Sequence, residues 1–177
     1  LETGATVIVS GRRREALDSL KGDFPEYAGR IHVVTMDVTD EASVTEAFDT
    51  MADDVGLPDV VVSNAGVATS KKAMDLTGSD WDTVVDTNLK GCWLVANEAA
   101  RRLSATNRGG SIIMISSILG HRVAGNVAPY AAAKAWPLYT SDAADERSSV
   151  DIGGRRNHQK NQPSEHASER TSISQTC

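Results

Sequence analysis

Short runs of apolar, mostly β-branched residues alternate with helical patterns along this chain, and this alternation restricts its fold more than any other feature. Four such runs occur, at residues 5–10, 31–36, 59–63 and 111–115. A continuous apolar run is typical of a strand that is buried on both faces of a parallel sheet. Between the runs, apolar residues recur three and four positions apart, as on the buried face of a helix. The alternation predicts an α/β fold, with a parallel sheet and helices on both of its faces.

Two helical segments can be placed from their caps and their apolar stripes. The first follows Thr39 or Asp40, because either side chain can cap a helix, and it is expected to bury Val44, Ala47, Phe48 and Met51. The second covers residues 81–104 after a cap at Ser79 or Asp80, and Trp93 is expected on its apolar stripe. Each helix would thus cover the sheet with one face.

Composition and charge exclude several classes of function. The 177 residues carry a net charge of −6 and a pI near 5.2, which argues against nucleic-acid binding as a main role. No apolar run is long enough to span a membrane. The two cysteines and four scattered histidines form neither a disulfide framework nor a metal site. We expect a cytoplasmic protein, since no signal peptide is present, but a chain that begins with Leu1 rather than Met says little about targeting.

The last apolar run leads into residues that can carry chemistry. A turn opens on Ser116 and Ser117, and a helix is expected to start near Ala128. Tyr130 and Lys134 are four residues apart and therefore share one face of that helix. An ammonium group beside a phenol favours the phenolate, which suits a tyrosine to general acid/base work. Alone, the pair is equally compatible with a half-buried ring on a surface helix; Ser117 adds to it because open α/β sheets bind ligands at their strand ends.

Together, Ser117, Tyr130 and Lys134 resemble the short-chain dehydrogenase/reductase family, which carries Y-x-x-x-K on a helix and a catalytic serine thirteen residues before the tyrosine. Residues 86–91, DTNLKG, are similar to the segment that holds the family's catalytic asparagine, here Asn88. The resemblance implies a Rossmann-like, doubly wound parallel sheet. It also implies four roles: Tyr130 exchanges a proton with the substrate oxygen, Ser117 hydrogen-bonds that oxygen, Lys134 contacts the nicotinamide ribose and assists the tyrosine, and Asn88 orders a relay water.

Three arginines, Arg12 to Arg14, follow the first apolar run at the start of a helical pattern. They fit a solvated helix start, but the helix dipole disfavours cations there, so the cluster also suggests an anionic partner. In dinucleotide folds an acid near the end of the second strand reads the ribose 2′-hydroxyl, whereas an arginine accepts a 2′-phosphate. Because no acid stands at Ser10 or Gly11, the resemblance implies that Arg12, together with Arg13, binds the cofactor and that NADP is preferred over NAD.

Two further segments match cofactor-binding parts of the family. The pair Asp37-Val38 ends the second apolar run, and the resemblance implies that its carboxylate meets the adenine amino group. The sequence SNAG at 63–66 is similar to the family's N-N-A-G box, with Ser in place of the first Asn. By that resemblance Asn64, Ala65 and Gly66 shape the floor beneath the adenosine. Without it, each segment is a tight turn at a strand end.

Two parts of the sequence depart from the family pattern. No G-x-x-x-G-x-G turn occurs, and the family places that turn ahead of the point where Leu1 begins, so we expect a truncated fold. Pro137 is expected to interrupt the last helix, and the few apolar residues after it have no regular spacing. This stretch also resembles a translated sequencing-library adapter. We therefore divide the chain into a partial NAD(P)-binding domain, residues 1–136, and an unstructured tail, 137–177, which we interpret as non-native read-through rather than a natural disordered tail.

The resulting hypothesis is an NAD(P)-dependent oxidoreductase that transfers a hydride between nicotinamide and a carbonyl compound or a secondary alcohol. The fragment itself is expected to be inactive. Its implied partners are a small carbonyl or alcohol substrate and, at full length, further copies of the chain in a homo-tetramer or dimer, with no nucleic acid, membrane or metal. The alternative is a non-catalytic dinucleotide-sensing or oligomerisation module of the same fold.

Overall fold

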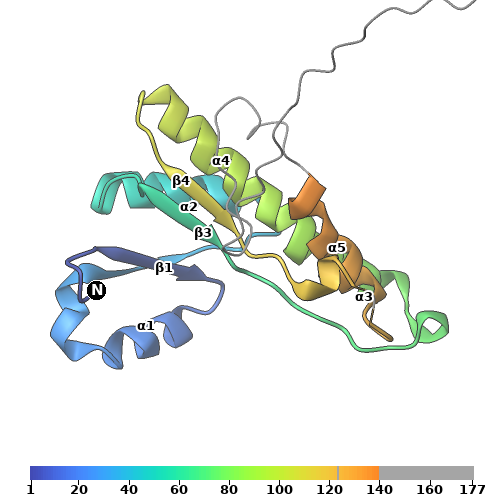
Figure 1. Cartoon of the computed structure of the whole chain (residues 1–177). Coiled ribbons are helices and arrows are strands. Elements are labelled where there is room, and N and C mark those ends of the chain that lie inside the picture. Colours follow the sequence, from blue (N-terminus) through green and yellow to red (C-terminus); the bar gives the residue numbers. More distant parts are fainter. Residues whose placement is uncertain (123, 140–177) are drawn as a thin grey trace, which may run out of the picture. The chain divides into compact units, whose positions relative to one another are not determined.

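The computed structural model describes residues 1–122 and 124–139, so nearly all of the stretch assigned to a tail lies outside the described residues. Strands and helices alternate along the chain (Figure 1), and all described strand pairs are parallel, which confirms the predicted α/β class. The elements in chain order are β1 (Val7–Gly11), α1 (Arg14–Gly22), η1 (Pro25–Arg30), β2 (Ile31–Thr35), α2 (Glu41–Asp54), β3 (Val60–Ser63), η2 (Ala73–Asp75), α3 (Gly78–Val85), η3 (Asp86–Lys90), α4 (Gly91–Ala105), β4 (Ser111–Met114), η4 (Ile118–Gly120) and α5 (Ala128–Tyr139).

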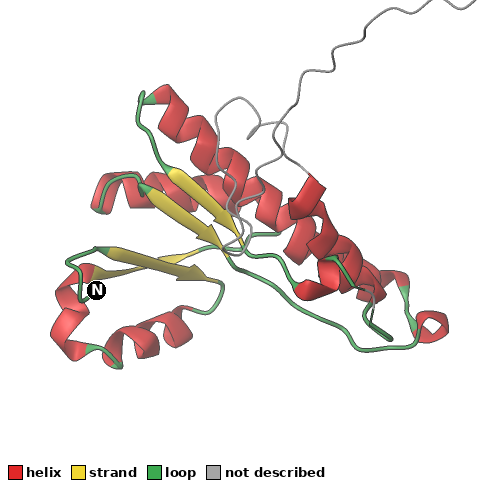
Figure 2. Ribbon diagram, viewed as in Figure 1, coloured by secondary structure: helices red, strands yellow, loops and turns green. Residues whose placement is uncertain are grey.

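The described strands form two separate pairs rather than one continuous sheet. Strand β1 pairs with β2, and β3 pairs with β4, both in parallel register. Figure 2 shows the two pairs as yellow arrows, with helices packed along them. Each pair joins strands that are consecutive in the chain and are linked by a helical crossover, as parallel pairing requires.

The core lies where α2 and α4 pack against both strand pairs. Its buried members include Val34 from β2, Val61 from β3 and Leu94 from α4. The four residues predicted to be buried on α2 are all buried there, and Phe48 is only 2% exposed. The Asp40 side chain accepts a hydrogen bond from the backbone N–H of Ala42, so Asp40 is the cap of this helix. Apolar spacing of three and four residues therefore placed this helix correctly.

The long helix expected at 81–104 differs from the structure at its start. It begins at Gly78, and its cap is Thr77, whose hydroxyl accepts a hydrogen bond from the Asp80 backbone N–H at 3.1 Å. The Asp80 carboxylate accepts in return from the Thr77 N–H at 3.0 Å. This reciprocal capping box satisfies two free donors at once, which explains why Thr77 rather than Ser79 or Asp80 is the cap.

Two further expectations about helices are wrong: that Trp93 lies on the apolar stripe of the long helix, and that Pro137 interrupts the last helix. A π-helical turn, η3, interrupts the long helix, and the buried side then runs through Val84, Asn88, Cys92 and Val95. This spacing leaves Trp93 off the buried side, where it is 47% exposed. In α5 the helix also continues past Pro137 to Tyr139.

Candidate functional site

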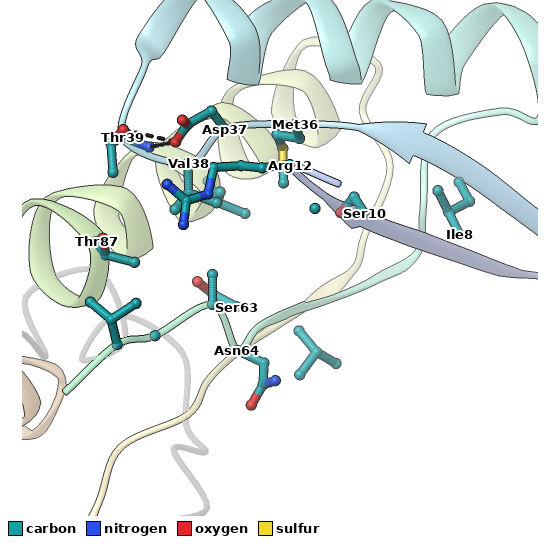
Figure 3. Close-up of a pocket in the computed structure, with 16 residues that line it drawn as sticks. Ile8, Ser10, Arg12, Met36, Asp37, Val38, Thr39, Ser63, Asn64 and Thr87 are labelled. Atoms are coloured by element: carbon teal, nitrogen blue, oxygen red, sulfur yellow. Dashed lines mark hydrogen bonds between the residues drawn. The ribbon is translucent and has the colours of Figure 1, made fainter. Parts of the chain in front are cut away.

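A cavity of about 380 Å³ lies at the carboxyl ends of β1, β2 and β3. This is where open α/β sheets bind ligands, and the volume is within the range of small-molecule sites. Figure 3 shows Arg12, Asp37 and Val38 on one side of the cavity and Ser63 and Asn64 on the other. Six residues that the sequence assigned to the cofactor line it: Arg12, Asp37, Val38, Asn64, Ala65 and Gly66.

Asp37 is held as an anion with one oxygen committed to its own turn. Its Oδ1 accepts the backbone N–H of Thr39 at 2.9 Å and the Thr39 hydroxyl at 2.8 Å. These hydrogen bonds, first the backbone one, lower the pKa of the Asp37 carboxyl, and the nearby Arg12 guanidinium lowers it further. Since both of these bonds go to Oδ1, Oδ2 can accept a hydrogen bond from a ligand amino group.

Arg12 and Arg13 are placed differently, although they are neighbours in the chain. The Arg12 side chain lines the cavity and is exposed. Arg13 is the N-cap residue of α1 and does not line the cavity. Arg14 pairs with Asp18 one helical turn further on. The arginine cluster therefore presents one guanidinium to the cavity.

Gly66 is a glycine because Asn88 fills the space beside it. A Cβ at Gly66 would lie 2.6 Å from Asn88 Oδ1, which is closer than real contacts allow. Asn88 is 1% exposed, and its amide nitrogen donates to the carbonyl oxygens of Val67 at 2.7 Å and Val84 at 2.8 Å. The bond to Val67 fastens the cavity-lining turn after β3 to the π-helical turn η3, whereas the bond to Val84 reaches back to α3, four residues earlier.

The Asn88 Oδ1 atom is buried and has no hydrogen-bond donor within the described part of the chain. A buried amide oxygen without a donor is costly, so such an atom needs a water or ligand donor. The wide turn of a π-helix at this point matches the association of such turns with functional sites. We therefore count Asn88 among the candidate functional residues.

Helix α5 carries Tyr130 and Lys134 side by side. The Lys134 ammonium lies 5.9 Å from the centroid of the Tyr130 ring, and the lysine is 5% exposed. Its Nζ donates to the Ile115 carbonyl oxygen at 2.7 Å, at the end of β4. An ammonium carries three donors, so two N–H groups are not used by this bond.

Ser117 lies at the start of η4, on the segment that packs against α5. Its hydroxyl oxygen accepts the backbone N–H of Leu119 at 3.2 Å. A hydroxyl that accepts in this way still has its own proton to donate. Ser117 can thus act as a donor to a ligand oxygen.

Two contacts that sequence reasoning missed fix α5 against the Ser117 turn. The Ser116 hydroxyl donates to the Lys134 carbonyl oxygen at 2.7 Å. A Cβ on Gly120 would lie 2.4 Å from that same carbonyl oxygen, so only glycine permits this close approach. Neither contact follows a local sequence pattern, although the small residues of the Ser116–Gly120 segment are compatible with close packing.

The structure brings the predicted residues together in two groups. Six of the residues assigned to the cofactor line one cavity, whereas Arg13 and the residues of α5, Tyr130 and Lys134, do not. The proposed catalytic group lies on η3, η4 and α5, and α5 packs against both of the others. Within the described ranges, no three His, Cys, Asp or Glu side chains are arranged to hold a metal ion. None of the described helices is both long enough and apolar enough to cross a membrane.

Comparison with known proteins places this arrangement in a family. Gluconate 5-dehydrogenase of Gluconobacter oxydans is 30% identical over 131 residues, which are 74% of this chain and 51% of that protein. Cis-4-hydroxycyclohexanecarboxylate dehydrogenase of Sinomonas cyclohexanicum is 37% identical over 135 residues, 76% of this chain and 53% of that protein. The chain thus spans about half the length of the curated relatives it matches.

Solved structures agree with these relatives. The crystal structure of a gluconate 5-dehydrogenase from Burkholderia cenocepacia, in complex with NADP and tartrate, superposes with a TM-score of 0.72 at 30% identity and covers 81% of this chain and 57% of that chain. A short-chain type dehydrogenase/reductase from Mycobacterium marinum gives a TM-score of 0.75 at 30% identity, over 81% of this chain and 57% of that chain. The family model for short chain dehydrogenase matches residues 1–151. The chain belongs to the short-chain dehydrogenase/reductase family, with its Rossmann-like fold.

Proposed function

We propose that this chain supplies the adenosine-binding end and the proton-transfer residues of an NAD(P)-dependent oxidoreductase. The reaction moves a hydride between a nicotinamide cofactor and a carbonyl compound or secondary alcohol. The observation that carries the proposal is the position of the Arg12 guanidinium beside the Asp37 carboxylate in one cavity. The Arg12 cation matches the 2′-phosphate of a phosphorylated adenosine, and the Asp37 hydrogen-bond acceptor matches its adenine amino group.

The residues present fit the adenosine 2′-phosphate of NADP better than the plain ribose of NAD. The Arg12 guanidinium is exposed in the cavity and can bind a phosphate by donating two parallel N–H hydrogen bonds to its oxygens. Asp37 Oδ2 is available for the adenine amino group, because the hydrogen bonds from Thr39 go to Oδ1. Asn64, Ala65 and Gly66 form the opposite wall. When bound, the cofactor supplies the hydride chemistry itself.

The proposed roles of the catalytic residues agree with their geometry. The Ser117 hydroxyl accepts from Leu119 N–H and keeps its proton for the substrate oxygen. Tyr130 transfers the single proton that accompanies the hydride, and Lys134, whose Nζ donates to the Ile115 carbonyl oxygen, holds its ammonium beside the Tyr130 ring. Lys134 also has N–H groups left for ribose hydroxyls. Asn88 Oδ1, which finds no donor among the described residues, supports the relay-water role of Asn88.

Titration of the labelled chain with nucleotides tests the cofactor assignment. We expect adenosine 2′,5′-bisphosphate to bind more tightly than 5′-AMP in an NMR shift titration, which also measures weak binding. Arg12→Ala should remove about 10- to 100-fold of that preference, the effect of losing a charged hydrogen-bonded pair. The matched control is Arg13→Ala, because Arg13 is adjacent but does not line the cavity. Equal losses in both variants, or equal binding of both nucleotides, would contradict the assignment.

A second experiment separates catalysis from sensing. In the full-length protein, Tyr130→Phe should abolish turnover of the substrate while leaving NADP binding intact, because only the proton-carrying hydroxyl is lost. A non-catalytic dinucleotide sensor or oligomerisation module would keep its function in this variant. We expect the 177-residue chain alone to reduce no ketone detectably with NADPH, and we expect the full-length protein to form a homo-tetramer or dimer, which analytical ultracentrifugation checks.

A further inference from the structure

The backbone N–H of Asp37 finds its acceptor outside the sheet. Strand β2 ends at Thr35, and the N–H of Met36 still donates to the Gly11 carbonyl oxygen of β1 at 3.0 Å. The next N–H, that of Asp37, donates instead to the hydroxyl oxygen of Ser43 on α2 at 2.9 Å. An N–H left without an acceptor is costly where water is partly excluded. Ser43 thus supplies the acceptor that the sheet no longer offers.

The Ser43 hydroxyl behaves differently from the other hydroxyl groups of α2. Thr45 and Thr50 each donate to the carbonyl oxygen four residues earlier in the helix, at 3.0 Å, which is the common local bond of such residues. The Ser43 hydroxyl oxygen accepts from a residue six positions earlier, ahead of the helix. Ser43 and Asp37 are both half-buried, so water competes with this bond less than at an exposed site. The bond therefore links α2 to the strand end that borders the cavity.

Asp37 is held at almost every polar atom. Its carbonyl oxygen accepts the Asp40 N–H at 3.2 Å, and its Oδ1 accepts the N–H and the hydroxyl of Thr39. Figure 3 shows the Thr39 bonds beside Arg12 in the cavity. Oδ2 accepts no hydrogen bond from the part of the chain that the structure describes. The bonds from Thr39 and Asp40 lie within one loop, whereas the Ser43 bond fixes that loop to a helix.

We propose that Ser43 is a positioning residue that holds Asp37 so that the cavity selects a base with an exocyclic amino group. The inference rests on the proposed function, in which Asp37 Oδ2 accepts a hydrogen bond from the adenine amino group. An ionised carboxylate only accepts hydrogen bonds, so Oδ2 attracts an N–H donor and repels a carbonyl oxygen at the same place. Such bonds depend steeply on direction, and the Ser43 bond fixes the direction. Ser43 does not itself line the cavity, so it acts through Asp37.

Two nucleotides that differ in one group measure this selection. Adenosine 2′,5′-bisphosphate and inosine 2′,5′-bisphosphate carry the same phosphates, but inosine has a carbonyl oxygen where adenosine has the amino group. In NMR shift titrations of the ¹⁵N-labelled 177-residue chain, we expect the adenosine nucleotide to bind about tenfold more tightly. Ser43→Ala should reduce this preference about fivefold, mainly through weaker binding of the adenosine nucleotide.

Three further variants separate positioning from a general structural role. Ser43→Thr keeps the hydroxyl and should keep the preference. Ser43→Cys keeps the size of the side chain but offers only a weak acceptor, so it should lose the preference as the alanine variant does. The matched control is Thr45→Ala, because Thr45 is half-buried on the same helix and its hydroxyl bonds within that helix. This control should keep the preference of the parent chain.

A readout that needs no nucleotide follows Asp37 itself. Hydrogen bonds from Thr39 lower the pKa of the Asp37 carboxyl, and the Arg12 guanidinium lowers it further. Loss of the Ser43 bond loosens the loop and weakens the bonds from Thr39. The pKa of Asp37, measured by ¹³C NMR titration, should therefore rise toward its ordinary value in Ser43→Ala and stay low in Thr45→Ala.

Three outcomes would overturn the inference and leave the proposed function standing. One is an equal loss of affinity for both bisphosphates in Ser43→Ala, which marks a structural role. Another is a parent chain that prefers adenosine 2′,5′-bisphosphate over 5′-AMP but binds the inosine nucleotide equally well. The third is an unchanged pKa of Asp37 in Ser43→Ala. A parent chain that binds neither bisphosphate would overturn the inference and the proposed function together.

Discussion

Gly91, at the start of α4, packs closely against Val38, a residue that lines the cavity, and its replacement should be costly. A Cβ at this position would lie 2.7 Å from Val38 Cγ2 and 3.0 Å from both the Cβ and the carbonyl oxygen of Val38. Carbon atoms in favourable contact are about 3.5–4.0 Å apart, so Val38 and its backbone must shift. Such overpacking costs about 1–3 kcal/mol, while Ala in a helix gains about 0.5–1 kcal/mol over Gly.

Gly91→Ala is therefore expected to lower the free energy of unfolding by about 1–2 kcal/mol. Gly78→Ala is the matched control, because Gly78 also begins a helix and its added Cβ would meet nothing within 4 Å. The control should raise the free energy of unfolding by about 0.5 kcal/mol. Urea unfolding followed by circular dichroism measures both variants. Equal stabilities of the two variants would refute the packing argument.

Three other predictions concern a buried carboxylate, a helix cap and an exposed carboxylate. Glu98 is 6% exposed and pairs with two arginines of its own helix, so Glu98→Gln should lower the free energy of unfolding by about 1–3 kcal/mol. The control is Asp18→Asn, which breaks an exposed ion pair and should cost less than about 0.5 kcal/mol. Thermal melts with equal midpoints for the two variants would contradict this prediction. Thr77→Ala should cost about 1 kcal/mol through the lost cap. Hydrogen bonds from Lys71, and to a smaller extent from Thr77, lower the pKa of Asp80 from 3.8 to about 2. The stabilisation by the ionised Asp80 is present above about pH 4 and is lost as the pH falls toward 2. In acid titrations Asp80→Asn should therefore lose less stability than the parent protein over this range.

Residue spacing predicted most of the local structure. The four residues assigned to the buried face of α2 are buried, and α5 begins at Ala128 as expected. These features depend on periodicity and on short-range caps, which neighbouring residues decide. The start of α3 was missed because three polar residues compete for the cap, and the choice of Thr77 depends on reciprocal geometry.

The candidate site was predictable in its members more than in its contacts. Motif spacing indicated six of the residues that line the cavity, while Arg13 and Lys134, which were also assigned to the cofactor, lie outside its lining. It did not indicate that the Lys134 ammonium bonds the Ile115 carbonyl or that the Ser116 hydroxyl bonds the Lys134 carbonyl. Both partners lie on another element, 18 or 19 positions away in the chain, and no local pattern encodes which atoms meet.

The sequence by itself determined the alternation of strands and helices, the buried faces of the helices and the family motifs, because each is a matter of residue type and spacing. Only the tertiary structure decided which strands pair, which guanidinium faces the cavity, and which glycines are required by close approach. Gly66 against Asn88 and Gly91 against Val38 are examples. Those outcomes depend on how separate elements pack, and packing acts between residues that are distant in the chain but adjacent in space.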